Sequence, residues 1–162
     1  MIEIREAIDR DWEDIWPIFS SIVSKGETYG IDPRISKKQG KHLWLESPLK
    51  TFVAVLDGEI VGTYYVKPNH AGPGSHVCNC GYMVANTHRN KGLATTMCKH
   101  SQVEALEMGF KAMQFNLVAA SNERAIHLWQ KMGFDIVGAL PSAFNHPVKG
   151  FIDAFVMYKW LS

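Results

Sequence analysis

A basic turn between an apolar strand and a long helix has the residue types of an anion-binding site. Arg89, Lys91 and Gly92 occupy this turn within the stretch Val84–Ala94. The first turn of a helix offers backbone N–H groups without partners and the positive end of the helix dipole, which together stabilise a bound phosphate. Glycine permits close backbone approach, and the basic side chains add positive charge. The turn therefore predicts a phosphate-binding loop.

The spacing of this turn, Arg89-x-x-Gly92-x-Ala94, excludes two common nucleotide-binding motifs. A Walker loop requires Gly-x-x-x-x-Gly-Lys-Ser/Thr and a dinucleotide fingerprint requires Gly-x-Gly-x-x-Gly, and neither occurs here. The order of residues instead resembles the acyl-CoA pyrophosphate loop of the GNAT acetyltransferase superfamily. Taken alone, the motif also fits an ordinary basic turn between a strand and a helix.

Composition favours one globular domain, residues 1–162, acting on small molecules. The chain has 46% hydrophobic and 20% charged residues and a net charge of +1. No basic run favours nucleic acid, and no apolar run is long enough to cross a bilayer. The charged start Met1–Glu6 does not have the pattern of a secretory signal, so we expect a cytoplasmic protein. Cys78-x-Cys80 alone predicts neither a disulfide nor a metal site.

Hydrophobic periodicity predicts eleven elements in the order β-α-α-β-β-β-α-β-α-β-β. Strands are expected at 2–7, 51–56, 59–66, 76–84, 112–118, 134–140 and 150–160, and helices at 11–24, 33–47, 93–108 and 123–132. Asp57-Gly58 marks a hairpin, and Asp32-Pro33 is interpreted as a cap followed by the first helical position. A loop holding Pro141, His146 and Pro147 is expected between the last two strands. The pattern indicates a mixed sheet with helices on its faces.

Three further blocks resemble the GNAT pattern in the same order along the chain. They are Ile4-Arg5-x-Ala7 with Asp11-Trp12-x-x-Ile15, then Asn122-x-x-Ala125-x-x-Leu128-Trp129-x-x-x-Gly133-Phe134-x-x-x-Gly138, and finally Asp153–Tyr158. The resemblance runs from about residue 2 to residue 160. It implies a GNAT-like α/β fold with a mixed, mostly antiparallel central sheet of about seven strands and helices on both faces.

The resemblance also implies acetyl-CoA as co-substrate, with no metal. The strands at 76–84 and 112–118 would splay apart, and the pantetheine amides would pair with strand-edge groups near Met83 and Val84. Trp129 would pack against the cofactor, and Asn122 would act as a helix cap and a polar contact. The backbone N–H groups of the turn would hold the pyrophosphate, through Arg89, Asn90, Lys91, Gly92, Leu93 and Ala94.

Shorter motifs resemble one branch of the superfamily, which contains phosphinothricin acetyltransferases and fungal N-acetyltransferases acting on proline analogues. These motifs are Gly26-Glu27-Thr28-Tyr29, Asn79, Asn116 and the loop 144–150. The branch implies a small amine or amino-acid derivative as acceptor, contacted by Tyr29, Asn79 and Asn116. For each asparagine a structural hydrogen bond is the competing interpretation.

The implied reaction is direct attack of the acceptor amine on the thioester carbonyl. Glu27 is the first candidate base, directly or through a water, and His146 the second, although both residue types also occur simply as exposed loop residues. A backbone N–H near Val84 would stabilise the oxyanion. Many superfamily members carry tyrosine where this chain has Trp129, and an indole N–H cannot serve as a general acid at physiological pH. The thiolate would then leave unprotonated.

Two other functions are compatible with the same motifs. A protein or peptide N-acetyltransferase would need an open groove in place of a closed pocket. A non-catalytic acyl-CoA-binding module would account for the missing tyrosine at Trp129. Dimers are common in the resembling families, which adds a homodimer to these expectations.

Overall fold

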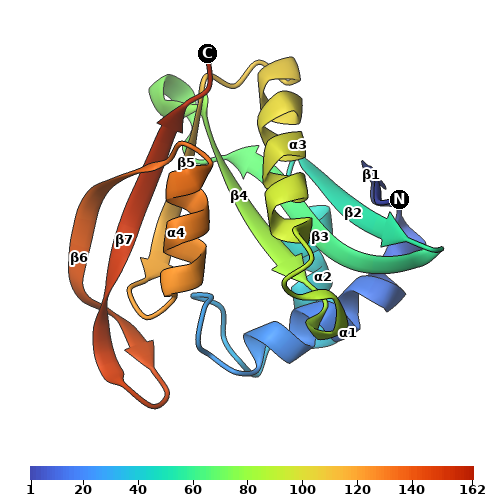
Figure 1. Ribbon diagram of the computed structural model, residues 1–162, viewed down its shortest axis with the longest axis horizontal. Helices are drawn as coiled ribbons and strands as arrows, with labels where there is room; N and C mark the ends of the chain where they lie inside the picture. The colour runs from blue at the N-terminus through green and yellow to red at the C-terminus, as the bar shows by residue number, and fades with distance from the viewer.

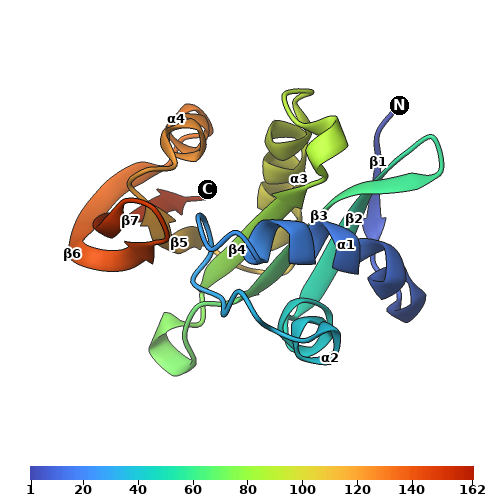
Figure 2. The same ribbon diagram turned by 90° about the horizontal axis from the view of Figure 1, so that it is seen from below.

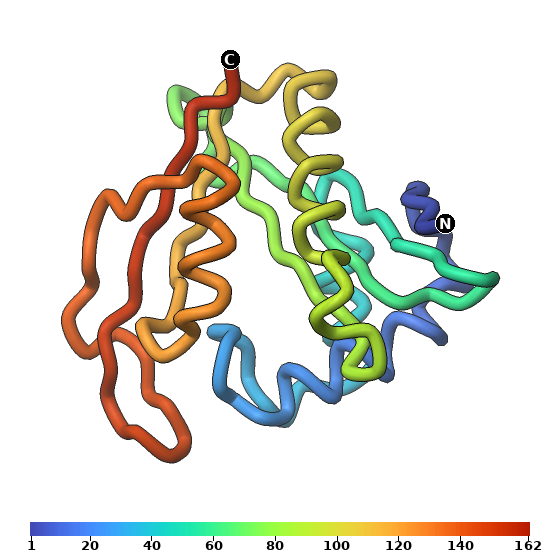
Figure 3. Tube along the Cα trace, in the orientation of Figure 1, coloured from blue at the N-terminus to red at the C-terminus, as the bar shows by residue number.

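The computed structural model describes residues 1–162 and contains one seven-stranded sheet in the order β1-β2-β3-β4-β5-β7-β6. All neighbouring strands are antiparallel except β4 and β5, which are parallel. The path of the chain can be followed in Figures 1 and 3. The strands are β1 (Glu3–Glu6), β2 (Lys50–Leu56), β3 (Glu59–Pro68), β4 (Val77–Val84), β5 (Ala112–Ala119), β6 (Asp135–His146) and β7 (Gly150–Trp160).

Helices cover both faces of the sheet. α1 (Trp12–Val23) and α2 (Lys37–Lys41), which continues as a π-helical turn over His42–Glu46, lie on one face. α3 (Leu93–Glu107) and α4 (Glu123–Lys131) lie on the other, as Figure 2 shows. The structure thus confirms the predicted mostly antiparallel α/β fold. No helix is both long and apolar enough to span a lipid bilayer.

Alternation along the strands separates two cores, one on each face. Even-numbered residues of β4, such as Tyr82, pack with Met97 of α3 in the larger core. Met83 packs with Trp44 and α1 in the smaller core. The two side-chain directions of β4 therefore lead to two different environments, one under α3 and one under α1.

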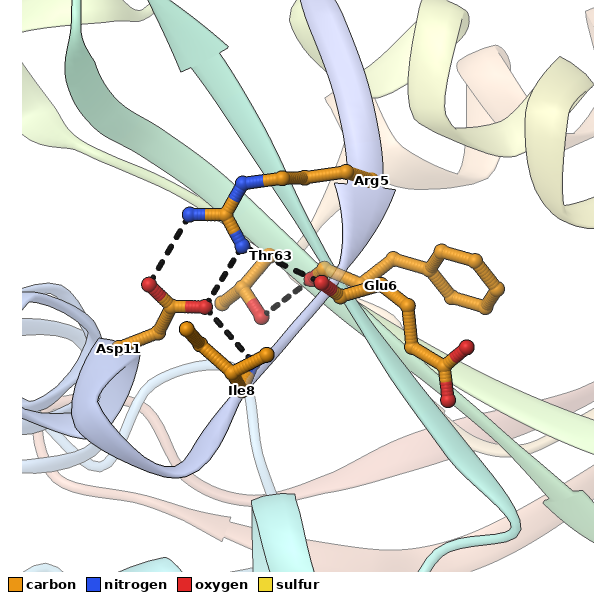
Figure 4. A network of polar contacts seen from close by, with 6 residues as sticks. Arg5, Glu6, Ile8, Asp11 and Thr63 are labelled. Carbon is orange, nitrogen blue, oxygen red and sulfur yellow. Dashed lines mark hydrogen bonds and ion pairs between the residues drawn. The ribbon is translucent and has the colours of Figure 1, made fainter.

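An ion pair fixes the start of α1 to β1. The guanidinium of Arg5 donates to both carboxylate oxygens of Asp11, at 2.8 and 3.0 Å, and the backbone N–H of Ile8 donates to the same carboxylate at 2.8 Å (Figure 4). Asp11 is only 5% exposed. The hydrogen bond from Arg5 is the main reason that the pKa of the Asp11 carboxyl lies below its ordinary value.

Two predicted boundaries were wrong. The second helix begins at Lys37 rather than at Pro33, because Ser36 caps it: the Ser36 hydroxyl accepts from the Gln39 N–H, and the Gln39 side chain accepts from the Ser36 N–H, both at 3.1 Å. β6 continues through the predicted loop to His146. Its pairing with β7 shifts register between Leu140 and Phe144, and an edge strand tolerates Pro141 because its N–H side is not needed for pairing.

Candidate active site

β4 and β5 diverge shortly after they begin to pair. Only two residue pairs connect them, Val77 with Ala112 and Cys78 with Met113. At the fork the Asn79 side chain bridges the gap, donating to the Gln114 carbonyl at 2.9 Å. Beyond this point the facing edges of the two strands do not pair, which opens the sheet as the GNAT resemblance implied.

The opening forms a cleft of about 1130 Å³ that reaches both faces of the sheet. On the face of α3 and α4, which we call the cofactor half, it is lined by residues of the basic turn, α3 and α4. On the face of α1 and α2, which we call the amine half, it is lined chiefly by Tyr29, Trp44, Tyr65, Lys67 and Asn79. One continuous cavity thus joins the two halves through the sheet.

The basic turn has the backbone of an anion cradle. Asn90 has φ +63° and Gly92, at the N-cap of α3, has φ +77°, a conformation that favours glycine. Gly92 has no side chain to cap the helix, and the backbone N–H groups of Leu93, Ala94 and Thr95 make no hydrogen bond within the protein. These three donors line one end of the cleft together with Arg89. Lys91 is exposed and lies beside this lining.

α4 forms the opposite wall of the cofactor half. Its N-cap Asn122 accepts from the Ala125 N–H at 3.4 Å, as the sequence predicted. Arg124 reaches across to hydrogen-bond the Asn90 side chain, so it joins the two walls of this half. Trp129 lies against Tyr82, with the ring centroids 5.1 Å apart, so the aromatic ring that α4 itself contributes to the cleft is an indole.

The backbone of β4 presents alternate residues to the cleft. Both the N–H and the C=O of Tyr82 bond to the Tyr29 hydroxyl, with the N–H donating at 3.0 Å, so even-numbered residues face β5. Val84 has the same orientation. Met83 instead directs its backbone to β3, where it pairs with Thr63. Of the two predicted strand-edge residues, only Val84 therefore has its backbone groups toward the opening.

Aromatic side chains build the amine half. Tyr65 lies edge-on to Trp44, with centroids 4.8 Å apart, and its hydroxyl donates to Asn79 Oδ1 at 2.7 Å. Gly81 makes this packing possible, because a Cβ there would lie 2.5 Å from the Tyr65 ring. Tyr29 comes from the α1–α2 loop, and burial raises the pKa of its hydroxyl. These contacts also use the polar atoms of Asn79, so its amide has a structural role at this position.

Asn116 lines the cleft from β5 and is exposed. Its side chain accepts from Gln114 Nε2 at 2.9 Å and donates to Asn69 Oδ1 at 2.7 Å. It therefore connects the mouth of the amine half to the loop after β3. Tyr29, Asn79 and Asn116, the three predicted substrate contacts, all lie along this one cavity.

The two predicted bases are placed elsewhere. Glu27 is exposed and does not line the cleft, whereas its neighbours Thr28 and Tyr29 do. His146 is buried at the end of β6, and its Nδ1 accepts the backbone N–H groups of Val148 and Lys149, each at 3.1 Å. The geometry of His146 is that of a turn-stabilising residue.

Sequence reasoning missed two cations of the cleft, Lys67 and Arg124. Arg124 follows the recognised cap Asn122 by two residues, so a helix start opposite the cradle could have indicated it. Lys67 is the second-last residue of β3, after the buried Val66, and no local signal places it. Cys78, Cys80 and Cys98 are buried free thiols, and no cluster of three potential metal ligands occurs.

The family model for the acetyltransferase (GNAT) family matches residues 3–134. The N-acetyltransferase aca1 of Schizosaccharomyces pombe is 29% identical over 151 residues, covering 83% of this chain and 72% of that protein. The L-amino acid N-acetyltransferase AaaT of Escherichia coli is 28% identical over 143 residues, covering 85% of each. The residues that the family model matches include the basic turn, β4, β5 and α4, which form the cleft described above.

Solved structures share the fold over nearly the whole chain. A GCN5-related N-acetyltransferase from Kribbella flavida is 40% identical with a TM-score of 0.93, and the match covers 98% of this chain and 97% of that one. A phosphinothricin acetyltransferase from Sinorhizobium meliloti, in complex with acetyl-CoA, has a TM-score of 0.87 at 16% identity and covers 99% and 89%. At that identity the second match concerns the fold alone.

Proposed function

The chain belongs to the GNAT family of acetyltransferases, and on that premise we propose that it acetylates the α-amino group of a small amino-acid-like substrate. It is an acetyl-CoA-dependent N-acetyltransferase. The observation that carries the proposal is the single cleft joining the free N–H groups of α3 to the aromatic amine half. The cytoplasmic location and the homodimer stay predictions.

The cofactor half suits the pyrophosphate and pantetheine of acetyl-CoA. The unpaired N–H groups of Leu93, Ala94 and Thr95, at the positive end of a fifteen-residue helix, are donors for an anion. Arg89 and Arg124 add positive charge on either side. The edge of β4 at Val84 offers a backbone donor and acceptor to an extended amide chain. Acetyl-CoA supplies the activated acetyl group, and these residues hold it.

The N–H of Val84 is our candidate donor to the acetyl carbonyl oxygen, because it faces the opening between the strands. A fixed backbone donor at this position stabilises developing negative charge without reorganisation. The corresponding group of Tyr82 already bonds to the Tyr29 hydroxyl. Val84 is therefore the first β4 edge residue beyond Tyr82 whose groups face the opening.

Deprotonation of the amine needs no dedicated side chain in this proposal. At pH 7, each pKa unit of the amine above 7 adds about 1.4 kcal/mol to the cost of losing its proton, so this cost is about 4.6 kcal/mol for a lysine side chain with a pKa near 10.4. The α-amino group of a free amino acid has an intermediate cost, because its own carboxylate raises its pKa above the value near 8 of a peptide N-terminus. Neither Glu27 nor His146 lines the cleft. We therefore assign proton removal to solvent water.

No side chain beside Trp129 is suited to protonate the departing thiolate. The Tyr82 hydroxyl is engaged with Ser101 at 2.6 Å, and burial raises the pKa of Tyr82 well above its ordinary value. A thiol with an ordinary pKa near 8.5 leaves readily as the thiolate. Trp129 then acts as a packing wall, and solvent supplies the proton later.

An acceptor panel tests the proposal. The purified protein is given acetyl-CoA with single amino acids, a polyamine and a peptide with a free N-terminus, and CoA release and acetylated products are measured. We expect turnover with free amino acids. Acetylation of the peptide alone would indicate a peptide N-acetyltransferase, and binding of acetyl-CoA without turnover on any acceptor would indicate a binding module. Either result would overturn the proposal.

A further inference from the structure

Lys67 is a cation without a partner in the amine half. It lies on β3 opposite Asn79 and on the same face as Tyr65. Its side chain lines the cleft, is partly buried, and makes no hydrogen bond or ion pair within the protein. The ammonium lies 5.1 Å from the centroid of the Tyr65 ring. The contact with Tyr65 orients this ammonium but does not neutralise it.

The other charged group of the amine half is already compensated. Asp32 accepts the Arg34 backbone N–H at 2.9 Å and lies 3.5 Å from the Arg34 guanidinium. Its side chain is 59% exposed, so water also solvates the carboxylate. The uncompensated charge that faces the amine half is therefore positive. An acceptor carrying an anionic group fits it better than a polyamine does.

The rest of the lining of the amine half is largely apolar and large. Aliphatic side chains surround the aromatic group of Trp44 and Tyr65, and they come from α1, from the loop after it, from the π-helical turn and from β5: Ile22, Ile31, Ile35, Leu43 and Leu117. Such a wall gains free energy by removing a large apolar side chain from water. A substrate with a small or charged side chain would leave this surface unused.

We propose that the acceptor is an α-amino acid with a large apolar side chain and that Lys67 binds its carboxylate. This inference rests on the proposed function and names its substrate class. Lys67 binds the α-carboxylate, which distinguishes an amino acid from a simple amine, while the apolar residues of the wall contact the substrate side chain. A substrate carboxylate beside Lys67 pairs with the ammonium that has no partner in the protein, and this ion pair stabilises the bound substrate.

The test compares acceptors that share one side chain and differ at the carboxylate, with kcat/KM expressed per unprotonated amine because the carboxylate also raises the pKa of the amine. Leucine, leucinamide and 3-methylbutylamine share one side chain, and kcat and KM are measured for each with the wild-type protein and with Lys67→Met and Lys67→Arg. Lys99→Met, which changes an exposed lysine of α3, is the matched control. Thermal unfolding of each variant verifies that it is folded.

We expect the wild-type protein to prefer leucine. Because a hydrogen bond to a charged group contributes a factor of about 10 to 150, Lys67→Met should lower the leucine-to-leucinamide ratio of kcat/KM by about that factor. The change should appear mainly in the KM for leucine. Lys67→Arg should keep most of the preference, since it keeps the charge, and Lys99→Met should keep all of it.

The outcomes separate this inference from the proposed function. Equal use of leucine and leucinamide by the wild type, or an unchanged ratio in Lys67→Met, would overturn the role of Lys67 and leave amino-acid acetylation standing. Preference for 3-methylbutylamine would overturn the substrate class. Failure of the wild type with every free amino acid would instead overturn the proposed function, and this inference with it.

Discussion

Replacing Gly92 with alanine separates the role of the cradle from the stability of the fold. Gly92 and Gly109 flank the same helix, with φ +77° and +93°, and a Cβ at either position meets no atom within 4 Å. An L-residue in the left-handed region costs about 1–2 kcal/mol. We therefore expect Gly92→Ala and Gly109→Ala to lose similar free energies of unfolding, so Gly109→Ala is a matched control.

The two variants should differ in acetyl-CoA binding. Relief of the strain at Gly92 rotates the turn that carries the N–H groups of Leu93, Ala94 and Thr95. One lost hydrogen bond to a phosphate costs about 1.5–3 kcal/mol, which weakens binding about 10- to 150-fold. Gly109 lies beyond the other end of α3, a fifteen-residue helix about 22 Å long at 1.5 Å per residue, so its replacement should leave the dissociation constant unchanged.

Isothermal titration calorimetry with acetyl-CoA and urea unfolding of the same preparations measure both quantities. The expected result is two variants of similar stability, of which only Gly92→Ala binds acetyl-CoA weakly. A Gly92→Ala protein that binds within about twofold of wild type would refute the assignment of the cradle. Equal weakening in both variants would show that the effect comes from the helix as a whole.

Three further predictions concern other parts of the structure. Asp11→Asn should lower the free energy of unfolding by about 1–3 kcal/mol at pH 7. The pKa of Asp11 is lower in the folded than in the unfolded protein, so this difference in stability should persist above pH 4 and fade as the pH falls through the folded pKa. Urea unfolding of both proteins at several pH values measures it. With an amino-acid acceptor, kcat/KM should rise with pH and level off above the pKa of the acceptor amine, and Glu27→Gln should show the same pH profile as the wild type. A Glu27→Gln protein whose rate is reduced relative to wild type most strongly at low pH would instead identify Glu27 as the base. His146→Ala should lower the free energy of unfolding by about 1 kcal/mol and leave turnover within twofold of wild type, because the His146 ring accepts two backbone N–H groups outside the cleft. A large loss of kcat in a folded His146→Ala protein would contradict this.

Features encoded by neighbouring residues were predictable from the sequence. The hairpin at Asp57-Gly58 has φ +51° and +82° at its two central residues, as that dipeptide predicts. The cap at Asn122 depends likewise on a few adjacent side chains. The strand-to-helix turn with Gly92 in the left-handed region was predictable because its motif is short and its backbone requirement is local.

Features set by distant contacts were not predictable in the same way. Asp32-Pro33 and Ser36-x-x-Gln39 are both helix-start signals, and the helix follows the second, where the Lys37 carbonyl accepts from Trp12 Nε1 at 3.2 Å. The position of Lys67 opposite Asn79 depends on the register of β3 with β4. Glu27 has suitable chemistry, but its loop directs Thr28 and Tyr29 into the cleft instead.

Transfer of a labelled acetyl group tests the central claim most directly. The protein is incubated with acetyl-CoA carrying ¹³C at the carbonyl and with leucine, and the products are followed by NMR. The account predicts an amide carbonyl signal from N-acetylleucine that grows in step with CoA release. Intact acetyl-CoA, or labelled acetate without the amide, would contradict it.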